Sequence, residues 1–287
     1  MRARALVALV AVALLGGCGS DTKSDTGSAQ DVLKRAAQTP AKSADLKLAM
    51  QLRLDGVSQL KGPLKLTVTG PTRSNGRRKL PDLDWRIRAE GAGKKVALRL
   101  IATGDNAYVS YGGQTFEVGR ELVRRFMSKS QSNAPQKIRL DASHWLKDGK
   151  VGDGGRSVSG QLDVRKMLAD VNRLAAKLPR GHQLDKKTIA QVDDAVKDAS
   201  IQFRVGDDHI LRSSHFDVRF ELPDELRSRA KGLKGGRLQF TTQQSNVNGN
   251  QHVTAPSGAR PLTELLQRFG VPPGALLGPG FTSPSPG

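Results

Sequence analysis

The N-terminal half of the chain alternates apolar and polar residues with a period of two, the pattern of half-buried β-strands. The clearest run extends from Leu46 to Leu54, where every second residue is Leu or Met and the residues between them are Lys, Ala, Gln and Arg. The alternation recurs in segments that turn residues separate, at 64–69, 83–89, 96–100, 107–111 and 115–118. These segments predict an antiparallel meander with one aliphatic and one polar face.

Helical spacing of apolar residues interrupts this strand pattern. A first helix is predicted over 29–38, with Ser28 as its N-cap. The longest apolar stripe covers 164–178, preceded by Asp163 as a fitting N-cap, and a second central helix covers 187–197. Shorter helical segments are predicted at 120–128, 143–146, 223–230 and 261–269, and further strands at 158–162, 201–205, 214–222 and 237–247.

The predicted fold class is α+β, with one large curved antiparallel sheet, a half-barrel, and a few helices. About ten strands make a wide sheet, and wide sheets twist and curl. Strands before and after the central helices share one pattern, so a single domain over 29–270 is expected.

The aliphatic face of this sheet must be covered, and two interpretations stay open. The helices either fill it as an ordinary core, or they leave a hydrophobic cavity that suits acyl chains, which gain roughly 0.8 kcal/mol for each buried CH₂ group. The second interpretation predicts a cavity lined by strand positions and closed by the helix over 164–178. Its lining residues would be Leu48, Met50, Leu66, Ile87, Leu98, Val171 and Leu174.

The N-terminus combines Arg2 and Arg4 with an apolar run over 5–15, which ends at Leu15-Gly16-Gly17-Cys18. That run is too short to span a bilayer but fits the core of a signal peptide, predicted here as residues 1–17. Residues 18–28 are polar and small, and therefore predict a flexible tether. The Pro- and Gly-rich segment 271–287 is expected to be disordered. For the N-terminal segment, one interpretation is an ordinary secretory signal in which Cys18 is incidental. The other is a signal in which Cys18 itself is the site of processing.

The composition of the chain restricts the classes of binding partner that we expect. The formal net charge is +19, which favours anionic partners such as acidic lipid headgroups or wall polymers. Nucleic acid is not expected as a partner, because the chain carries an export signal and only 4% of its residues are aromatic. Cys18 is the only cysteine, so a disulfide within the chain is excluded.

The sequence offers no assembled catalytic site. Its five histidines are scattered, without a metalloprotease motif or a His pair at helical spacing. The segment from Gly152 to Ser159 fails both the nucleophile-elbow and the dinucleotide-binding patterns at their last positions. We therefore predict no enzyme activity, no catalytic residue, no metal and no cofactor.

Leu15-Gly16-Gly17-Cys18 resembles the lipobox of bacterial lipoproteins. The resemblance implies cleavage between Gly17 and Cys18, and a diacylglyceryl group on the Cys18 thiol. It also implies a protein exported and anchored to the outer face of the cell membrane.

Further segments resemble the LolA/LppX-like family of lipoproteins, whose members related to LppX and LprG come from mycobacteria. The resemblance rests on the lipobox and on residues 104–118, 145–148, 160–164 and 220–223. It implies an actinobacterial lipoprotein whose half-barrel sheet is closed by helices around a lipid cavity. The expected function is that of a membrane-anchored protein that binds a lipid or a lipid-linked glycan. If the protein is a carrier, it also transfers this ligand. The alternative is a non-carrier envelope scaffold or sensor that contacts acidic lipids or wall polymers.

Overall fold

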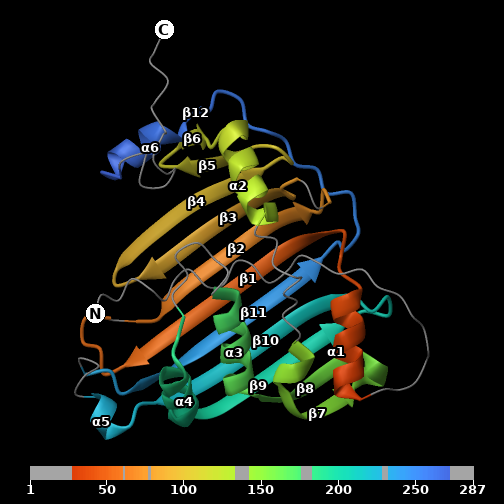
Figure 1. Cartoon of the computed structure of the whole chain (residues 1–287), viewed down its shortest axis with the longest axis vertical. Coiled ribbons are helices and arrows are strands. Elements are labelled where there is room, and N and C mark those ends of the chain that lie inside the picture. Colours follow the sequence, from red (N-terminus) through yellow and green to blue (C-terminus); the bar gives the residue numbers. More distant parts are fainter. Residues whose placement is uncertain are drawn as a thin grey trace.

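The fold is described by a computed structural model, shown in Figure 1. It covers residues 28–60, 62–76, 79–132, 142–175, 183–227 and 232–271. The predicted signal peptide, Cys18 and the tether up to residue 27 lie outside the described residues, as does the predicted disordered tail beyond Val271.

The described strands form one 12-stranded sheet in the order β12-β6-β5-β4-β3-β2-β1-β11-β10-β9-β8-β7. All neighbours are antiparallel except β12 and β6. The strands are β1 (Ser43–Asp55), β2 (Leu64–Arg73), β3 (Asp82–Gly91), β4 (Lys94–Ala102), β5 (Ala107–Tyr111), β6 (Gln114–Glu117), β7 (Leu146–Gly152), β8 (Ser157–Leu162), β9 (Val196–Val205), β10 (Leu211–Glu221), β11 (Gly235–Ser245) and β12 (Arg260–Pro261). Because β1 pairs with both β2 and β11, strands from the two ends of the chain meet in the centre. The predicted large antiparallel sheet with a few helices is confirmed.

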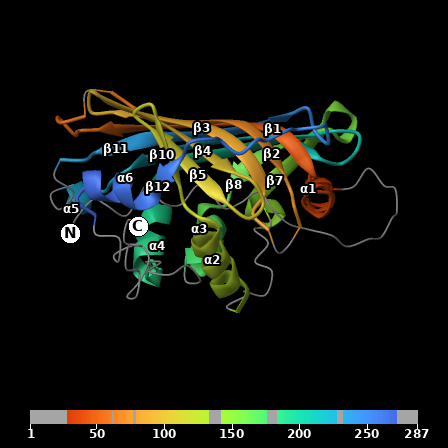
Figure 2. The same ribbon diagram turned by 90° about the horizontal axis from the view of Figure 1, so that it is seen from above.

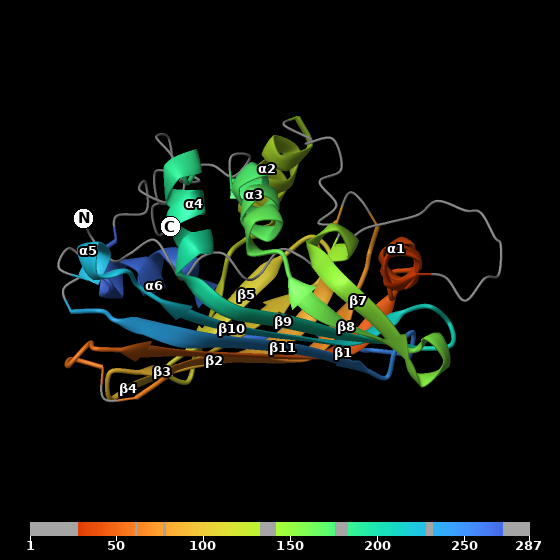
Figure 3. The ribbon, with the colours of Figure 1, turned by 90° about the horizontal axis from the view of Figure 1, so that it is seen from below.

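The described helices lie on one side of this sheet, as Figures 2 and 3 show. They are α1 (Ala29–Gln38), α2 (Arg120–Ser132), α3 (Val164–Ala175), α4 (Lys186–Ala195), α5 (Asp224–Arg227) and α6 (Leu262–Arg268). The 3-10 turn η1 (Ala142–Trp145) directly precedes β7, and the 3-10 turn η2 (Asp153–Gly155) forms the tip of the β7–β8 hairpin. The sheet arches, so its outer strands bend toward the helices. We call the side that carries the helices the concave face and the opposite side the convex face.

Both predicted N-caps are confirmed. The hydroxyl of Ser28 accepts a hydrogen bond from the backbone N–H of Asp31, whose carboxylate accepts one from the Ser28 N–H, so together they form a capping box. The Asp163 carboxylate accepts a hydrogen bond from the backbone N–H of Lys166 at 3.0 Å. The helix predicted over 187–197 instead ends at Ala195, because Val196 is extended and pairs with Phe220 as the first residue of β9.

Two strands were not predicted. β7 lacks a clean alternation, because it contains two glycines and a left-handed residue, Asp148 with φ 49°, at a register shift between Lys147 and Lys150. β12 has only two residues, Arg260 and Pro261, too few for any periodicity.

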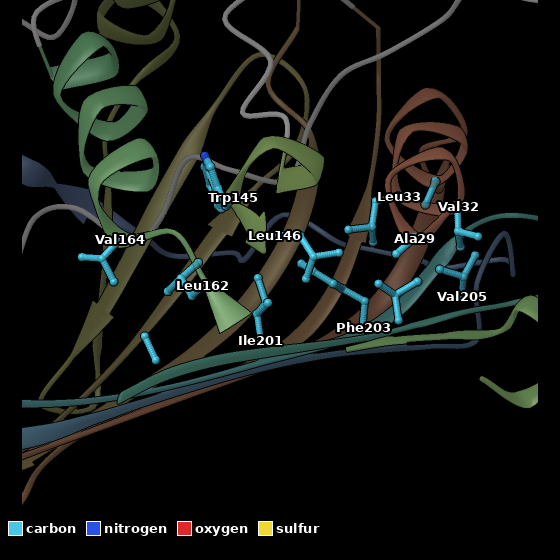
Figure 4. Packing of buried hydrophobic residues seen from close by; sticks show 13 residues of the cluster. Ala29, Val32, Leu33, Trp145, Leu146, Leu162, Val164, Ile201, Phe203 and Val205 are labelled. Carbon is cyan, nitrogen blue, oxygen red and sulfur yellow. The ribbon is translucent and has the colours of Figure 1, made fainter. Parts of the chain in front are cut away.

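The main hydrophobic core lies at the β7–β9 end of the sheet. Ala29, Val32 and Leu33 of α1 point toward Phe203 and Val205 of β9, as Figure 4 shows. The same cluster contains Ala36, Trp145, Leu146, Val158, Leu162, Val164, Ala199 and Ile201, and Ile201 is 0% exposed. The core therefore occupies one end of the concave face rather than its middle.

Candidate functional site

Strand register places the five predicted strand positions on the concave face. Leu48 lies opposite Val68, Val68 opposite Ile87, and Ile87 opposite Leu98, which makes one continuous row over β1, β2, β3 and β4. In the adjacent row, Met50 lies opposite Leu66. Side chains directly opposite one another on antiparallel strands are in contact range. These five residues therefore belong to two adjacent rows on one face of the sheet.

In the row that contains Leu48, the side chains become more exposed to solvent from β1 toward β4. Leu48 is 6% exposed and Val68 is 9% exposed, whereas Ile87 and Leu98 are half-buried. At the end of the neighbouring row, Val96 is 45% exposed. α1 and η1 pack at the other end of the sheet. In Figure 1, α2 crosses over part of β2–β4. The intermediate exposure of Ile87 and Leu98 therefore shows that the β2–β4 part of the face is only partly covered.

Aromatic residues extend the apolar face toward the core. Met50 lies opposite Phe240, Phe240 opposite Phe216, and Phe216 opposite Ile201. The rings of Phe216 and Phe240 are 5.8 Å apart, and those of Phe203 and Phe216 are 5.9 Å apart. The strand pattern marked Phe216 and Phe240 as apolar, but their place beside Met50 depends on the pairing of β1 with β11.

A second aromatic contact lies at the far end of the face. Tyr111 is opposite Leu98 and is 37% exposed, and its ring is 5.4 Å from that of Phe269, which is 58% exposed. Sequence reasoning did not assign Tyr111 or Phe269 to the site. Tyr111 directly precedes the Gly112-Gly113 turn, and only the pairing of β4 with β5 shows that it continues the Leu98 row.

The predicted helical side of the site is not assembled in the same way. Val171 on α3 is half-buried, and the side chain of Leu174 lies outside the described residues. The indole of Trp145 donates a hydrogen bond to Asp170 at 2.9 Å, which fixes α3 on η1. In Figure 1, α3 therefore lies over β10 and β11, whereas Ile87 and Leu98 lie beyond β1. The structure does not bring Val171 against Ile87 or Leu98.

The described pockets are lined by other residues. One of about 660 Å³ is lined by Asp153, Arg156, Arg204, Val205 and Arg212. A second, of about 210 Å³, lies around α4 and β9 and is lined by Lys147, Gln161, Leu162, Val164, Asp193, Val196, Lys197, Asp198 and Ala199. The predicted cavity residues of the strands thus form an open face rather than the wall of either pocket.

Two buried polar atoms on the concave face have no hydrogen-bond partner among the residues described. They are the indole nitrogen of Trp85, a donor, and the amide oxygen of Gln114, an acceptor. Trp85 lies opposite Leu100, two residues along β3 from Ile87, and Gln114 lies opposite Tyr111. Buried polar groups are almost always paired in proteins, so these two atoms are available to a polar partner.

Within the described ranges, no three side chains of the metal-binding types come together, and no helix is long and apolar enough to cross a membrane.

The polar convex face is held by ion pairs between strands. The guanidinium of Arg99 donates two hydrogen bonds to the Asp84 carboxylate, at 2.6 and 2.5 Å. These bonds hold the pKa of Asp84 below its ordinary value against the opposing effect of partial burial, and the nearby charge of Arg86 contributes in the same direction. Arg237 likewise lowers the pKa of Asp217 by hydrogen bonding.

Replacing Asp84 with asparagine is expected to reduce the loss of stability in acid. A carboxylate whose pKa is lowered by folding stabilises the protein above its unfolded pKa, and this stabilisation disappears as pH falls through the folded pKa. The pair is partly exposed, so the effect should be about 1 kcal/mol or less. Urea titrations between pH 7 and pH 2.5 measure it. Asp194→Asn, an exposed carboxylate with no ion pair described, is the control and should change the pH profile less.

The fold is similar to that of three solved structures. LprF from Mycobacterium bovis has a TM-score of 0.40 and 14% identity, over 81% of this chain and 100% of that one. A DUF1329 family protein from Desulfovibrio piger has a TM-score of 0.23 and 10% identity, over 79% of this chain and 93% of that one. A LolA superfamily protein from Nitrosomonas europaea has a TM-score of 0.20 and 10% identity, over 79% and 95%.

No family model and no curated protein sequence matches the chain.

Proposed function

We propose that this protein is an exported lipoprotein that binds the hydrocarbon chains of a lipid on its open apolar face. One observation supports this above the others: within a single row, exposure increases from the buried Leu48 to the half-buried Ile87 and Leu98. A connected aliphatic surface left open to water costs free energy, at roughly 25 cal/mol for each Å². A ligand that covers it recovers that free energy.

The chemistry of the face indicates which part of a lipid would lie there. The rows that contain Leu48 and Met50 consist of Leu, Ile, Val, Met, Phe, Ala, Thr and Ser across β1–β4 and β9–β11, with no charged residue. Such a surface binds acyl chains, which need no directional partners. The unpaired atoms of Trp85 and Gln114 could then bind a hydroxyl or carbonyl group near the head of the lipid, because one donates and the other accepts.

The anchor is a second part of the proposal. Cys18 would carry the lipid modification, and residues 18–28 would tether the domain to the outer face of the membrane. A flexible tether of this length holds a domain on the order of 17 Å from its anchor, at about 5–6 Å × √n. The apolar face would then remain close to the source of its ligand. Transfer of that ligand to another molecule is a second step of the same hypothesis, and it requires binding first.

The direct test is to purify the chain from its host, extract it with organic solvent, and measure the extract and the intact complex by mass spectrometry. We expect close to one lipid for each protein molecule, retained through washing in detergent-free buffer. Trp145→Phe leaves Trp85 as the single tryptophan, and its emission should shift when monoolein is added. A chain that never carries lipid and never responds to monoolein would instead support the alternative, a non-carrier envelope scaffold or sensor.

A further inference from the structure

The register of the sheet arranges the basic residues of the convex face into a band. One row runs without a break from Ser157 on β8 to Thr115 on β6, and its cations are Arg204, Lys47, Arg86 and Arg99. The adjacent row runs from Lys150 on β7 to Ala97 on β4 and contains Arg88.

Neither row contains an Asp or a Glu. The remaining positions are Ser, Thr, Gln, Ala and one His. We call these two rows the basic band.

The cations of the band face water, and most have no acidic partner. Lys47, Arg86, Arg88, Lys150 and Arg204 are exposed, and none of them forms an ion pair with a described residue. Arg99 pairs with Asp84, which lies just outside the band. Arg86 and Arg99 are directly opposite each other on neighbouring strands, and like charges in this position destabilise a sheet. The carboxylate of Asp84 offsets part of this repulsion, because it pairs with Arg99 and also interacts with the charge of Arg86. An anionic partner would offset more of it.

The band ends beside a pocket that adds two further cations. Arg204 lines the pocket of about 660 Å³ together with Arg156 and Arg212, and Asp153 is its one acidic lining residue among those described. Arg212 donates to Asp208 at 2.7 Å, and Arg156 lies 3.8 Å from Asp207, so both are partly neutralised. Arg204 is the pocket arginine without an acidic partner among the residues described. The basic band and this pocket thus form a continuous surface.

We propose that the basic band binds a linear, hydroxyl-rich polyanion such as an acidic polysaccharide. The first row crosses ten strands, about 40 Å at a spacing of ~4.8 Å, but the band is only two residues wide. A long, narrow track on an arched surface fits a flexible chain, which can follow the curvature, better than a flat bilayer. Ser, Thr and Gln between the cations supply hydrogen bonds to sugar hydroxyls. No Phe, Tyr or Trp lies in the band to stack nucleic-acid bases.

The experiment compares two variants of the purified full chain that lose the same charge. The band variant carries Lys47→Gln, Arg86→Gln, Arg88→Gln and Arg204→Gln. The control variant carries Lys34→Gln, Lys42→Gln, Lys186→Gln and Lys187→Gln, which replace exposed lysines outside the band. The probe is polygalacturonate, with dextran as the neutral polymer. Phosphatidylglycerol–phosphatidylcholine vesicles and an oligothymidine are measured in parallel.

We expect the band variant to bind polygalacturonate more weakly by on the order of tenfold or more, with a smaller salt dependence, because fewer counterions are released. The control variant should stay within about threefold of the parent, and dextran should not bind. Equal weakening of both variants would show that only net charge matters and would overturn the proposal. The proposal would also be overturned if the band variant lost only its binding to vesicles. The same holds if oligothymidine bound as tightly as polygalacturonate and lost as much affinity in the band variant.

Melting temperatures show whether each variant is folded. If the fourfold band variant does not fold, Arg88→Gln and Arg204→Gln are measured separately, each against Lys187→Gln. Each band substitution should weaken polygalacturonate binding more than the control substitution does, and no difference would again overturn the proposal. Lipid in the solvent extract is a separate readout, so failure here leaves the proposed lipid function to be judged by itself.

Discussion

Arginine in place of Leu98 is expected to remove bound lipid while leaving the domain folded. Leu98 lies in the open part of the apolar row, so in the free protein an arginine there can keep its charged head in water. Once acyl chains cover the face, the same charge would be buried without a partner, at a cost of several kcal/mol. Lipid recovered in the solvent extract should fall by tenfold or more, and the melting temperature should fall only slightly.

Two further variants separate this effect from a loss of folding. Ala97→Arg places the same residue on the same strand but on the convex face, so it should retain its lipid. Ile201→Ala removes a fully buried side chain and should destabilise the domain by about 2–5 kcal/mol. The prediction fails if Leu98→Arg lowers the stability of the domain as much as Ile201→Ala does and the parent protein never contains lipid. The apolar face would then be ordinary core.

Replacing Cys18 with alanine is expected to abolish attachment to the membrane. A thioether at Cys18 would be the anchor, so without the thiol the precursor should stay uncleaved or the domain should appear in the medium. Fractionation and intact mass measure this outcome. Ser20→Ala is a matched control within the tether and should remain membrane-bound. A mature parent protein of unmodified mass, beginning at any residue other than Cys18, would contradict the prediction.

Local signals allowed much of the fold to be predicted from sequence. Clean alternation from Leu46 to Leu54 predicted β1. Asp163 predicted the start of α3, because aspartate is common at helix N-caps, and its carboxylate accepts the expected hydrogen bond. β7 was not recognised because its glycines and the bulge at Asp148 break the alternation that identifies a strand. Elements are thus predictable where the local pattern and the final packing agree.

The site was predictable only in part. Alternation alone placed Leu48, Ile87 and Leu98 on one face, because parity along a strand fixes the side to which a residue belongs. It could not reveal that Met50 has Phe240 as a neighbour, since that contact depends on the register between distant strands. For the same reason the basic band is invisible in the sequence, where its residues are scattered from Lys47 to Gln243.

The central position of β1 also imposes an order on folding. β1–β6 can form through successive hairpins, but one edge of β1 has to wait for β11, whose residues 235–245 come late in the chain. Until then that edge presents unpaired backbone groups beside an apolar face, the combination that promotes strand addition between molecules. Pairings so distant in sequence also close slowly. The step that completes the sheet is therefore the one at which a nascent chain is most exposed to aggregation.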